Sequence, residues 1–161
     1  MKNNQLASIK ETKVIMINRV QFSIEIKADK VDIWKTLWDD NSYRDWAGVF
    51  FEGSYLTSDN WVEKSKVLFL GPDENGIYSI IETHIPNKTI SFKHIGNVVN
   101  GEEQPIDAQT EKWSGCTETY SLSEGKNSIK LTVEIDILDE HLDFMNKSFP
   151  KALEKIKENC S

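Results

Sequence analysis

The sequence predicts an α+β fold in which helices cover one side of an antiparallel sheet. The clearest strand is residues 20–27, where Val20, Phe22 and Ile24 alternate with polar side chains, the pattern of a half-buried strand. Several strand-like segments follow, and the turns between them are too short for crossover helices, so consecutive strands run antiparallel. Residues 139–160 are long and periodic enough for a full-length amphipathic helix, which can cover the apolar face of such a sheet.

The N-terminal part contains the first strand and two short helices. Residues 1–12 are polar and are expected to be flexible, whereas residues 13–161 are expected to form a single domain without repeats. Asp29 can cap a helix over residues 30–39, which has one apolar side. A second short helical turn is expected over residues 42–46.

The middle of the chain reads as strands separated by turn residues such as Gly, Pro, Asn and Asp. The expected strands are residues 53–58, 64–70, 76–85, 89–95, 111–123 and 128–137. Residues 96–110 interrupt this series as a long polar connection. Connections of this length are usually functional lids or disordered segments.

The C-terminal helix has one apolar stripe with charged residues on its other faces. The stripe consists of Leu142, Met145, Phe149, Leu153, Ile156 and Cys160. The ring of Pro150 removes a backbone hydrogen bond, so a kink or break is expected near residues 146–150, which leaves the second half of the helix better packed.

Composition excludes several classes of partner. The chain has 26 acidic and 19 basic residues, a formal charge of −7, and lacks a basic run that could neutralise nucleic acid or an anionic membrane surface. Its apolar runs are too short for a membrane span and no apolar signal core follows the N-terminus, so a cytoplasmic location is expected. The two cysteines, Cys116 and Cys160, fit a reducing compartment as buried free thiols, with a disulfide between them as the alternative.

Sequence motifs give no support for a metal or a cofactor. The three histidines, His84, His94 and His141, show no paired ligand spacing, and neither cysteine lies close to another zinc ligand. The chain contains no Gly-x-Ser-x-Gly elbow, P-loop or dinucleotide fingerprint. We therefore expect no metal site, no cofactor and no covalent acyl, phosphoryl or hydride transfer.

Four segments resemble the START-like (SRPBCC) superfamily. Residues 26–37 read IKADKVDIWKTL and residues 43–46 read YRDW, as at the start of START-like proteins, while residues 51–54 (FEGS) and 149–157 (FPKALEKIK) resemble the branch related to the C-terminal domain of the heat-shock ATPase activator. The resemblance implies a helix-grip fold, a curved antiparallel sheet of about six or seven strands around the long C-terminal helix, with two short helices after the first strand. It also implies a cavity for an apolar or amphipathic molecule between sheet and helix.

Strand periodicity selects side chains that would line such a cavity, since alternate residues of a strand share a face. Tyr78 shares a face with Glu82, Phe92 with His94, and Glu118 with Tyr120. If these mixed faces point inward, Glu82, His94, Glu118 and Tyr120 lie in or near the cavity and are the candidates for fixing a polar end of a ligand or for acid–base chemistry. The alternative is that each faces solvent or completes a satisfied buried hydrogen bond.

Aromatic residues outside these strands complete the candidate binding set. Trp113 follows the 96–110 connection and either flanks the mouth of the cavity or braces the connection. Phe50 and Phe51 can line an entrance to the cavity. Met145 and Phe149 face the sheet and line the cavity wall, with core packing as the alternative for these two residues. Trp34, Trp38 and Trp46 are expected to pack in the core. The candidate ligand-binding residues are Phe50, Phe51, Tyr78, Glu82, Phe92, His94, Trp113, Glu118, Tyr120, Met145 and Phe149.

Three functions are compatible with this reading. The first is binding of a lipid-like or polycyclic small molecule in the cavity. The second is a cyclase- or hydratase-like acid–base enzyme that uses Glu82, Glu118, His94 or Tyr120. The third is a co-chaperone-like module that binds a protein partner through its acidic surface. An open sheet also allows a homodimer through an edge strand.

Overall fold

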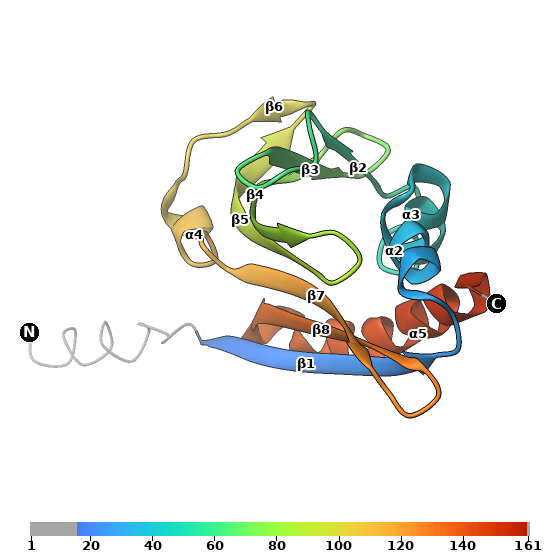
Figure 1. Ribbon diagram of the computed structural model, residues 1–161. Helices are drawn as coiled ribbons and strands as arrows, with labels where there is room; N and C mark the ends of the chain where they lie inside the picture. The colour runs from blue at the N-terminus through green and yellow to red at the C-terminus, as the bar shows by residue number, and fades with distance from the viewer. Residues whose placement is uncertain (1–15, 161) are drawn as a thin grey trace, which may run out of the picture.

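A curved antiparallel sheet of eight strands forms the larger part of the structure (Figure 1). This computed structural model describes residues 16–160, so the segment 1–12 that the sequence predicts to be flexible lies outside the described residues. The strands lie in the order β1 (Ile17–Ile26), β8 (Ile129–Leu138), β7 (Thr117–Glu124), β5 (Thr89–Val99), β4 (Gly76–Ile85), β3 (Lys66–Leu70) and β2 (Tyr55–Ser58). The two-residue strand β6 (Glu102–Glu103) pairs with β5, which makes one strand more than expected.

The long C-terminal helix packs on the concave side of this sheet, as predicted (Figure 1). A single 3₁₀ turn, η1 (Asp139–His141), leads into α5 (Leu142–Cys160). The chain remains helical on both sides of Pro150, so the helix is not broken there. Burial is concentrated from Ser148 onward, where Phe149, Leu153 and Ile156 pack against the sheet, so the second half of the helix is the better packed one. No helix in the described part of the chain is long and apolar enough to cross a membrane.

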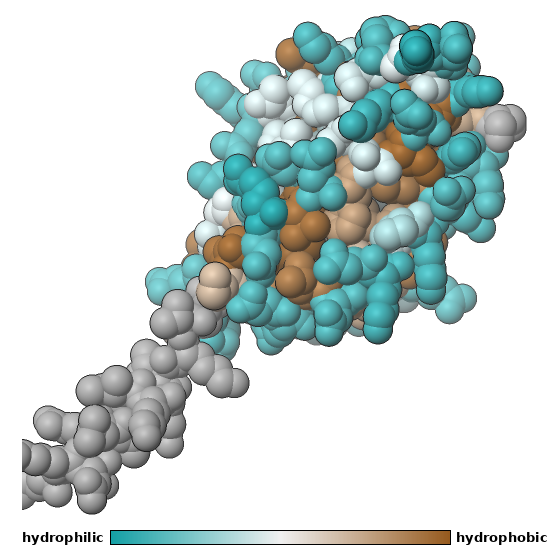
Figure 2. All heavy atoms as spheres, turned by 90° about the horizontal axis from the view of Figure 1, so that it is seen from below, coloured by the Kyte–Doolittle hydropathy of each residue, from teal (hydrophilic) through white to brown (hydrophobic). Residues whose placement is uncertain are grey.

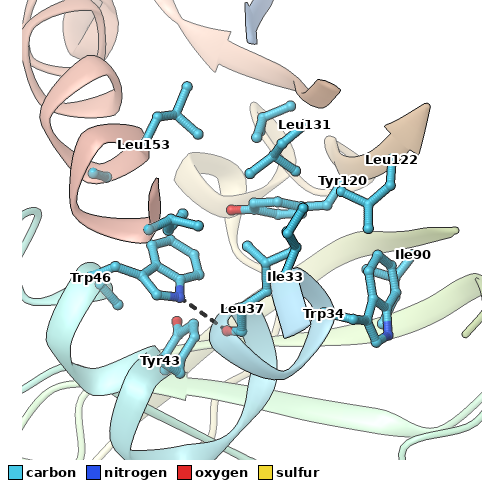
Figure 3. Packing of buried hydrophobic residues seen from close by; sticks show 14 of the residues in the cluster. Ile33, Trp34, Leu37, Tyr43, Trp46, Ile90, Tyr120, Leu122, Leu131 and Leu153 are labelled. Carbon is cyan, nitrogen blue, oxygen red and sulfur yellow. Dashed lines mark hydrogen bonds between the residues drawn. The ribbon is translucent and has the colours of Figure 1, made fainter. Parts of the chain in front are cut away.

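Two short helices close one end of the space between the sheet and α5. The predicted helix 30–39 is α2 (Lys30–Trp38), and the predicted turn 42–46 is a longer helix, α3 (Asp40–Ala47). Figure 3 shows how α2 and α3 are joined in the core, where the indole Nε1 of Trp46 donates a hydrogen bond to the carbonyl of Leu37 at 3.0 Å.

An aromatic cluster fills this end of the core, as expected for the tryptophans of the short helices. The ring of Trp38 lies 4.9 Å from that of Tyr120, 5.4 Å from Phe92 and 5.5 Å from Trp61, measured between centroids. Trp34 packs beside it, with its ring centroid 6.2 Å from that of Trp38. Such edge-to-face contacts favour rigid packing of the rings.

The prediction that residues 96–110 form one long polar connection is wrong, because much of this segment belongs to strands and a short helix. Strand β5 continues to Val99 and pairs with β6. The short helix α4 (Ala108–Glu111) follows, capped by Asp107, whose carboxylate accepts a hydrogen bond from the Thr110 amide at 2.8 Å. The strand predicted at 111–123 therefore begins only at Thr117.

Two bulges in the pairing of β4 with β5 decide which side chains face the helix. Ile81 lies opposite Phe92 and Thr83 lies opposite Ser91, so Glu82 is an extra residue without a partner across the strands. A second register shift lies between Tyr78, which is opposite Gly96, and Ser79, which is opposite His94. A bulge moves all subsequent side chains to the other face, so strict alternation cannot be read across it.

Candidate functional site

A cavity of about 570 Å³ lies between the sheet and the first half of α5. Its walls come from α3, from β3, β4, β5, β7 and β8, and from η1 and α5. The rings of Phe51 and Phe144 and the imidazole of His141 are exposed parts of the lining, so they mark the mouth. Apolar and aromatic side chains make up most of the remaining wall.

The structure brings eight of the eleven predicted ligand-binding residues together in this lining. They are Phe50, Phe51, His94, Trp113, Glu118, Tyr120, Met145 and Phe149. Phe92 lies instead in the core, fully buried between the rings of Trp38 and Phe69. Tyr78 lies on the outer face of the sheet, where its ring covers Gly96 so closely that a Cβ atom there would be 2.8 Å from the ring.

Glu82 does not join the other acidic and polar candidates. It is exposed at the bulge in β4, so the expectation that it shares the inner face with Glu118 is wrong. The inner face of β4 instead carries Ile77, Ser79 and Ile81 before the bulge. The sequence pattern could not locate the bulge, because an extra residue is defined only by the pairing of both strands.

A chain of hydrogen bonds crosses the inner face of three neighbouring strands. The Ser79 hydroxyl lies 2.6 Å from Nδ1 of His94, and Nε2 of His94 lies 3.2 Å from Oε1 of Glu118. The Tyr120 hydroxyl donates a hydrogen bond to Oε2 of Glu118. With the proton of a neutral imidazole on Nε2, Ser79 donates to His94 and His94 donates to Glu118, so every member is satisfied.

The charge of Glu118 acts on the two tyrosines near it. Burial raises the pKa of Tyr120 well above its usual value, and the adjacent Glu118 carboxylate raises it further. The same two causes, burial first and Glu118 second, raise the pKa of Tyr43, which lines the cavity from α3. Both phenols therefore stay neutral, and that of Tyr120 donates its hydrogen bond to Glu118.

A second carboxylate, Asp136, lies in the lining but is already compensated. It accepts hydrogen bonds from Nε of Arg19 at 2.9 Å and from the Thr117 amide at 2.9 Å. Burial alone would raise the pKa of Asp136, but the hydrogen bonds from Arg19 and Thr117 outweigh burial and lower it. The neighbouring Cys116 thiol has a pKa raised by burial, so it remains protonated.

Sequence reasoning missed Tyr43 and treated Trp46 as core packing only. Both residues and Ala47 form the buried side of α3 and line the cavity. Their spacing of three and four residues was visible in the sequence as a helical stripe. Within residues 16–160, no three His, Cys, Asp or Glu side chains are grouped so that they could hold a metal ion.

Comparison with known proteins identifies the fold. No family model matches the chain, and no curated protein matches it. Among solved structures, the chain is similar to the Aha1 dimer from Colwellia psychrerythraea, with 19% identity over 88% of this chain and 94% of that chain and a TM-score of 0.64. The chain has a START-like fold. The helix grip of this fold is the observed arrangement of sheet and α5.

The chain is also similar to two further solved structures. A Staphylococcus aureus protein of unknown function, SA2116, has 11% identity over 91% of this chain and 94% of that chain, with a TM-score of 0.66. DynU16, a putative protein in the dynemicin biosynthetic locus, has 11% identity and a TM-score of 0.59, and the match covers 87% of this chain but 46% of that chain. At these identities the similarity establishes the fold and not a shared activity.

Proposed function

We propose that this protein binds an apolar or amphipathic small molecule in the cavity between the sheet and α5. The observation that supports it is the composition of the lining, in which aromatic and aliphatic walls surround the polar groups of His94, Glu118 and Tyr120. Ligand sites in proteins typically combine a mostly apolar cavity of about 300–1,000 Å³ with a few placed polar groups. The cavity of about 570 Å³ falls within that range.

Native mass spectrometry tests this proposal on protein purified without detergent. We expect an additional mass that disappears on denaturation and can be identified after extraction. Met145→Trp, on the cavity side of α5, should lower ligand occupancy because the indole occupies space in the cavity. Lys147→Trp, on the exposed side of the same helix, is the matched control and should retain the ligand. Equal occupancy in both variants would place the ligand elsewhere.

Acid–base catalysis on the bound molecule is a second candidate function. It is favoured by the contact of Glu118 with both an imidazole and a phenol at the cavity wall, since such groups can exchange protons with a ligand. Glu118→Gln should abolish turnover of a substrate without unfolding the protein. Turnover that persists in this variant would remove Glu118 from the mechanism.

A homodimer is also proposed. One of the similar structures is a dimer of Aha1, which supports this assembly for a chain with the same fold. Size-exclusion chromatography with light scattering measures the mass directly, and a monomer at every concentration would exclude the assembly.

A further inference from the structure

The charge of the cavity wall limits the head groups that it can hold. The acidic and basic side chains in the lining are His94, Glu118, Asp136 and His141, and among the described residues no lysine or arginine lines the cavity. Asp136 is compensated by the guanidinium of Arg19. Glu118, in contrast, has an imidazole and a phenol as its hydrogen-bond partners within residues 16–160. Its side chain keeps 17% of its surface exposed, so the carboxylate remains accessible from the cavity.

Aromatic rings surround the Glu118 end of the cavity. Tyr120, which donates to Glu118, has its ring centroid 6.1 Å from that of Trp46, and the Tyr43 ring lies 5.1 Å from Trp46. The Phe69 ring lies 5.8 Å from the imidazole of His94. A carboxylate among aromatic faces favours a cation, because the negative charge and the ring quadrupoles both attract it.

An anionic head group lacks a counter-charge at this position. With a neutral His94, the polar chain carries the single negative charge of Glu118. With a protonated His94, the charges of His94 and Glu118 cancel and the chain is neutral. In neither state does the chain carry the net positive charge that a carboxylate or phosphate ligand requires.

Resting on the proposed binding function, we propose that the ligand has a cationic head group, an alkylated or protonated amine, that lies against Glu118 and the rings of Tyr43 and Trp46. The apolar part of this ligand packs against the cavity wall formed by α5 and β8. The cation replaces water at the exposed part of the carboxylate and leaves the bonds from His94 and Tyr120 in place.

Three probes with one chain length test the head group separately from the cavity. Decyltrimethylammonium, decanol and decanoate are titrated into the full chain, with tryptophan fluorescence and calorimetry as readouts. We expect the cation to bind at least about tenfold more tightly than decanoate, a difference of about 1.4 kcal/mol. Glu118→Gln should weaken cation binding by about tenfold and leave decanol binding unchanged. Glu124→Gln, an exposed position on the same strand, should change neither affinity.

The outcomes separate the two proposals. If decanol and decanoate bind as tightly as the cation, the head-group inference is wrong and the binding function stands. If Glu118→Gln leaves the cation affinity unchanged, the cation does not lie at Glu118. If none of the three probes binds, the proposed binding function itself is overturned.

A separate observation concerns β1, which forms one edge of the sheet. Figure 2 views the molecule from below, on the side where Figure 1 places β1 and α5, and shows an apolar strip between hydrophilic side chains. On β1, Val20, Phe22 and Ile24 are only half-buried, although Phe22 stacks on Phe149 of α5 at 4.7 Å. Edge strands with such a face pair readily with another strand.

The sequence of β1 is complementary to itself in one antiparallel register. When Phe22 lies opposite Phe22 of a second copy, Val20 lies opposite Ile24 on the helix side and Arg19 lies opposite Glu25 on the outer side. Two-fold symmetry places the Phe22 pair on the axis and produces the Val20–Ile24 and Arg19–Glu25 pairs twice. We infer that the homodimer forms by pairing of β1 with β1 in this register, with a second copy of this chain as the partner. Opposite charges across paired strands favour the register.

Charge reversal at Glu25 tests this surface, because Arg19 also compensates Asp136 and cannot be changed without disturbing it. Glu25→Arg places two arginines opposite each other and should weaken the dimer at least about tenfold in analytical ultracentrifugation. Glu25→Gln removes the charge without creating repulsion and should weaken the dimer less than Glu25→Arg. Glu102→Arg, an exposed position on β6, which pairs with β5 and not with β1, is the control and should leave the dimer unchanged. A dimer that is insensitive to Glu25→Arg would exclude this surface, and a wild-type monomer would exclude the assembly.

Discussion

Removal of the Tyr120 hydroxyl tests whether the polar chain at the cavity wall contributes to stability. Tyr120→Phe retains the ring contacts with Trp38 and Trp46 and removes the donor to Glu118. Hydrogen bonds to charged groups contribute about 1.5–3 kcal/mol, and loss of a donor to a buried acceptor costs about 1–3 kcal/mol. Because Glu118 keeps 17% of its side-chain surface exposed, cavity water can replace the donor in part. We therefore expect a loss of about 1–2 kcal/mol.

Urea unfolding of a double-mutant cycle measures this contribution. In a Glu118→Gln background the acceptor is neutral, so Tyr120→Phe should cost about 1 kcal/mol or less. Tyr78→Phe, on the outer face of the sheet, is the matched control and should change the free energy of unfolding by less than about 0.5 kcal/mol. Equal costs of Tyr120→Phe in both backgrounds would refute the assignment of a charge-assisted bond between Tyr120 and Glu118.

Three other predictions use the remaining contacts of the site. Phe149→Ala should reduce the free energy of unfolding by about 3–5 kcal/mol, whereas Phe144→Ala at the exposed mouth should reduce it by less than about 1 kcal/mol in the same urea assay. Because the pKa values of Tyr43 and Tyr120 are raised, both phenols should resist ionisation in an alkaline absorbance titration until the protein unfolds; ionisation of all tyrosines before unfolding would contradict this. The pKa of Asp136 is lowered in the folded protein, so its carboxylate stabilises the fold above its unfolded-state pKa and this contribution disappears as pH falls through the folded-state pKa. Asp136→Asn should therefore cost about 1–3 kcal/mol near neutral pH and make stability less sensitive to acid, as measured by urea unfolding over a pH series.

The elements that could be predicted from the sequence are those specified by local periodicity. The alternation along residues 20–27 gave the strand and its buried side, and the stripe from Leu142 to Ile156 gave the helix that the sheet grips. The same reasoning put His94, Glu118 and Tyr120 on strand faces that could line a cavity, and the regular pairing of β5 with β7 brings them together in the structure. A regular pairing preserves the alternation of faces from strand to strand.

Features that depend on pairing partners could not be predicted in this way. Glu82 has the same local pattern as a residue that faces inward, and only its lack of a partner on β5 shows that it is a bulge. The segment from Gly96 to Thr110 looked irregular because its polar residues hide β6 and a helix capped by Asp107. Pro150 does not break α5, since packing on the sheet maintains a helix that local propensity would interrupt.

The position of the cavity follows from where the large side chains lie in the space between the sheet and α5. At the end closed by α2, Trp38 and Trp61 pack with Phe92 and fill this space, whereas Met145 and Phe149 of α5 face the open part. The chain from Ser79 to Tyr120 lies between these regions and satisfies its own hydrogen bonds. This polar chain therefore does not require a ligand to satisfy its hydrogen bonds. A bound molecule should therefore raise the melting temperature by an amount that increases with the logarithm of its concentration divided by its Kd.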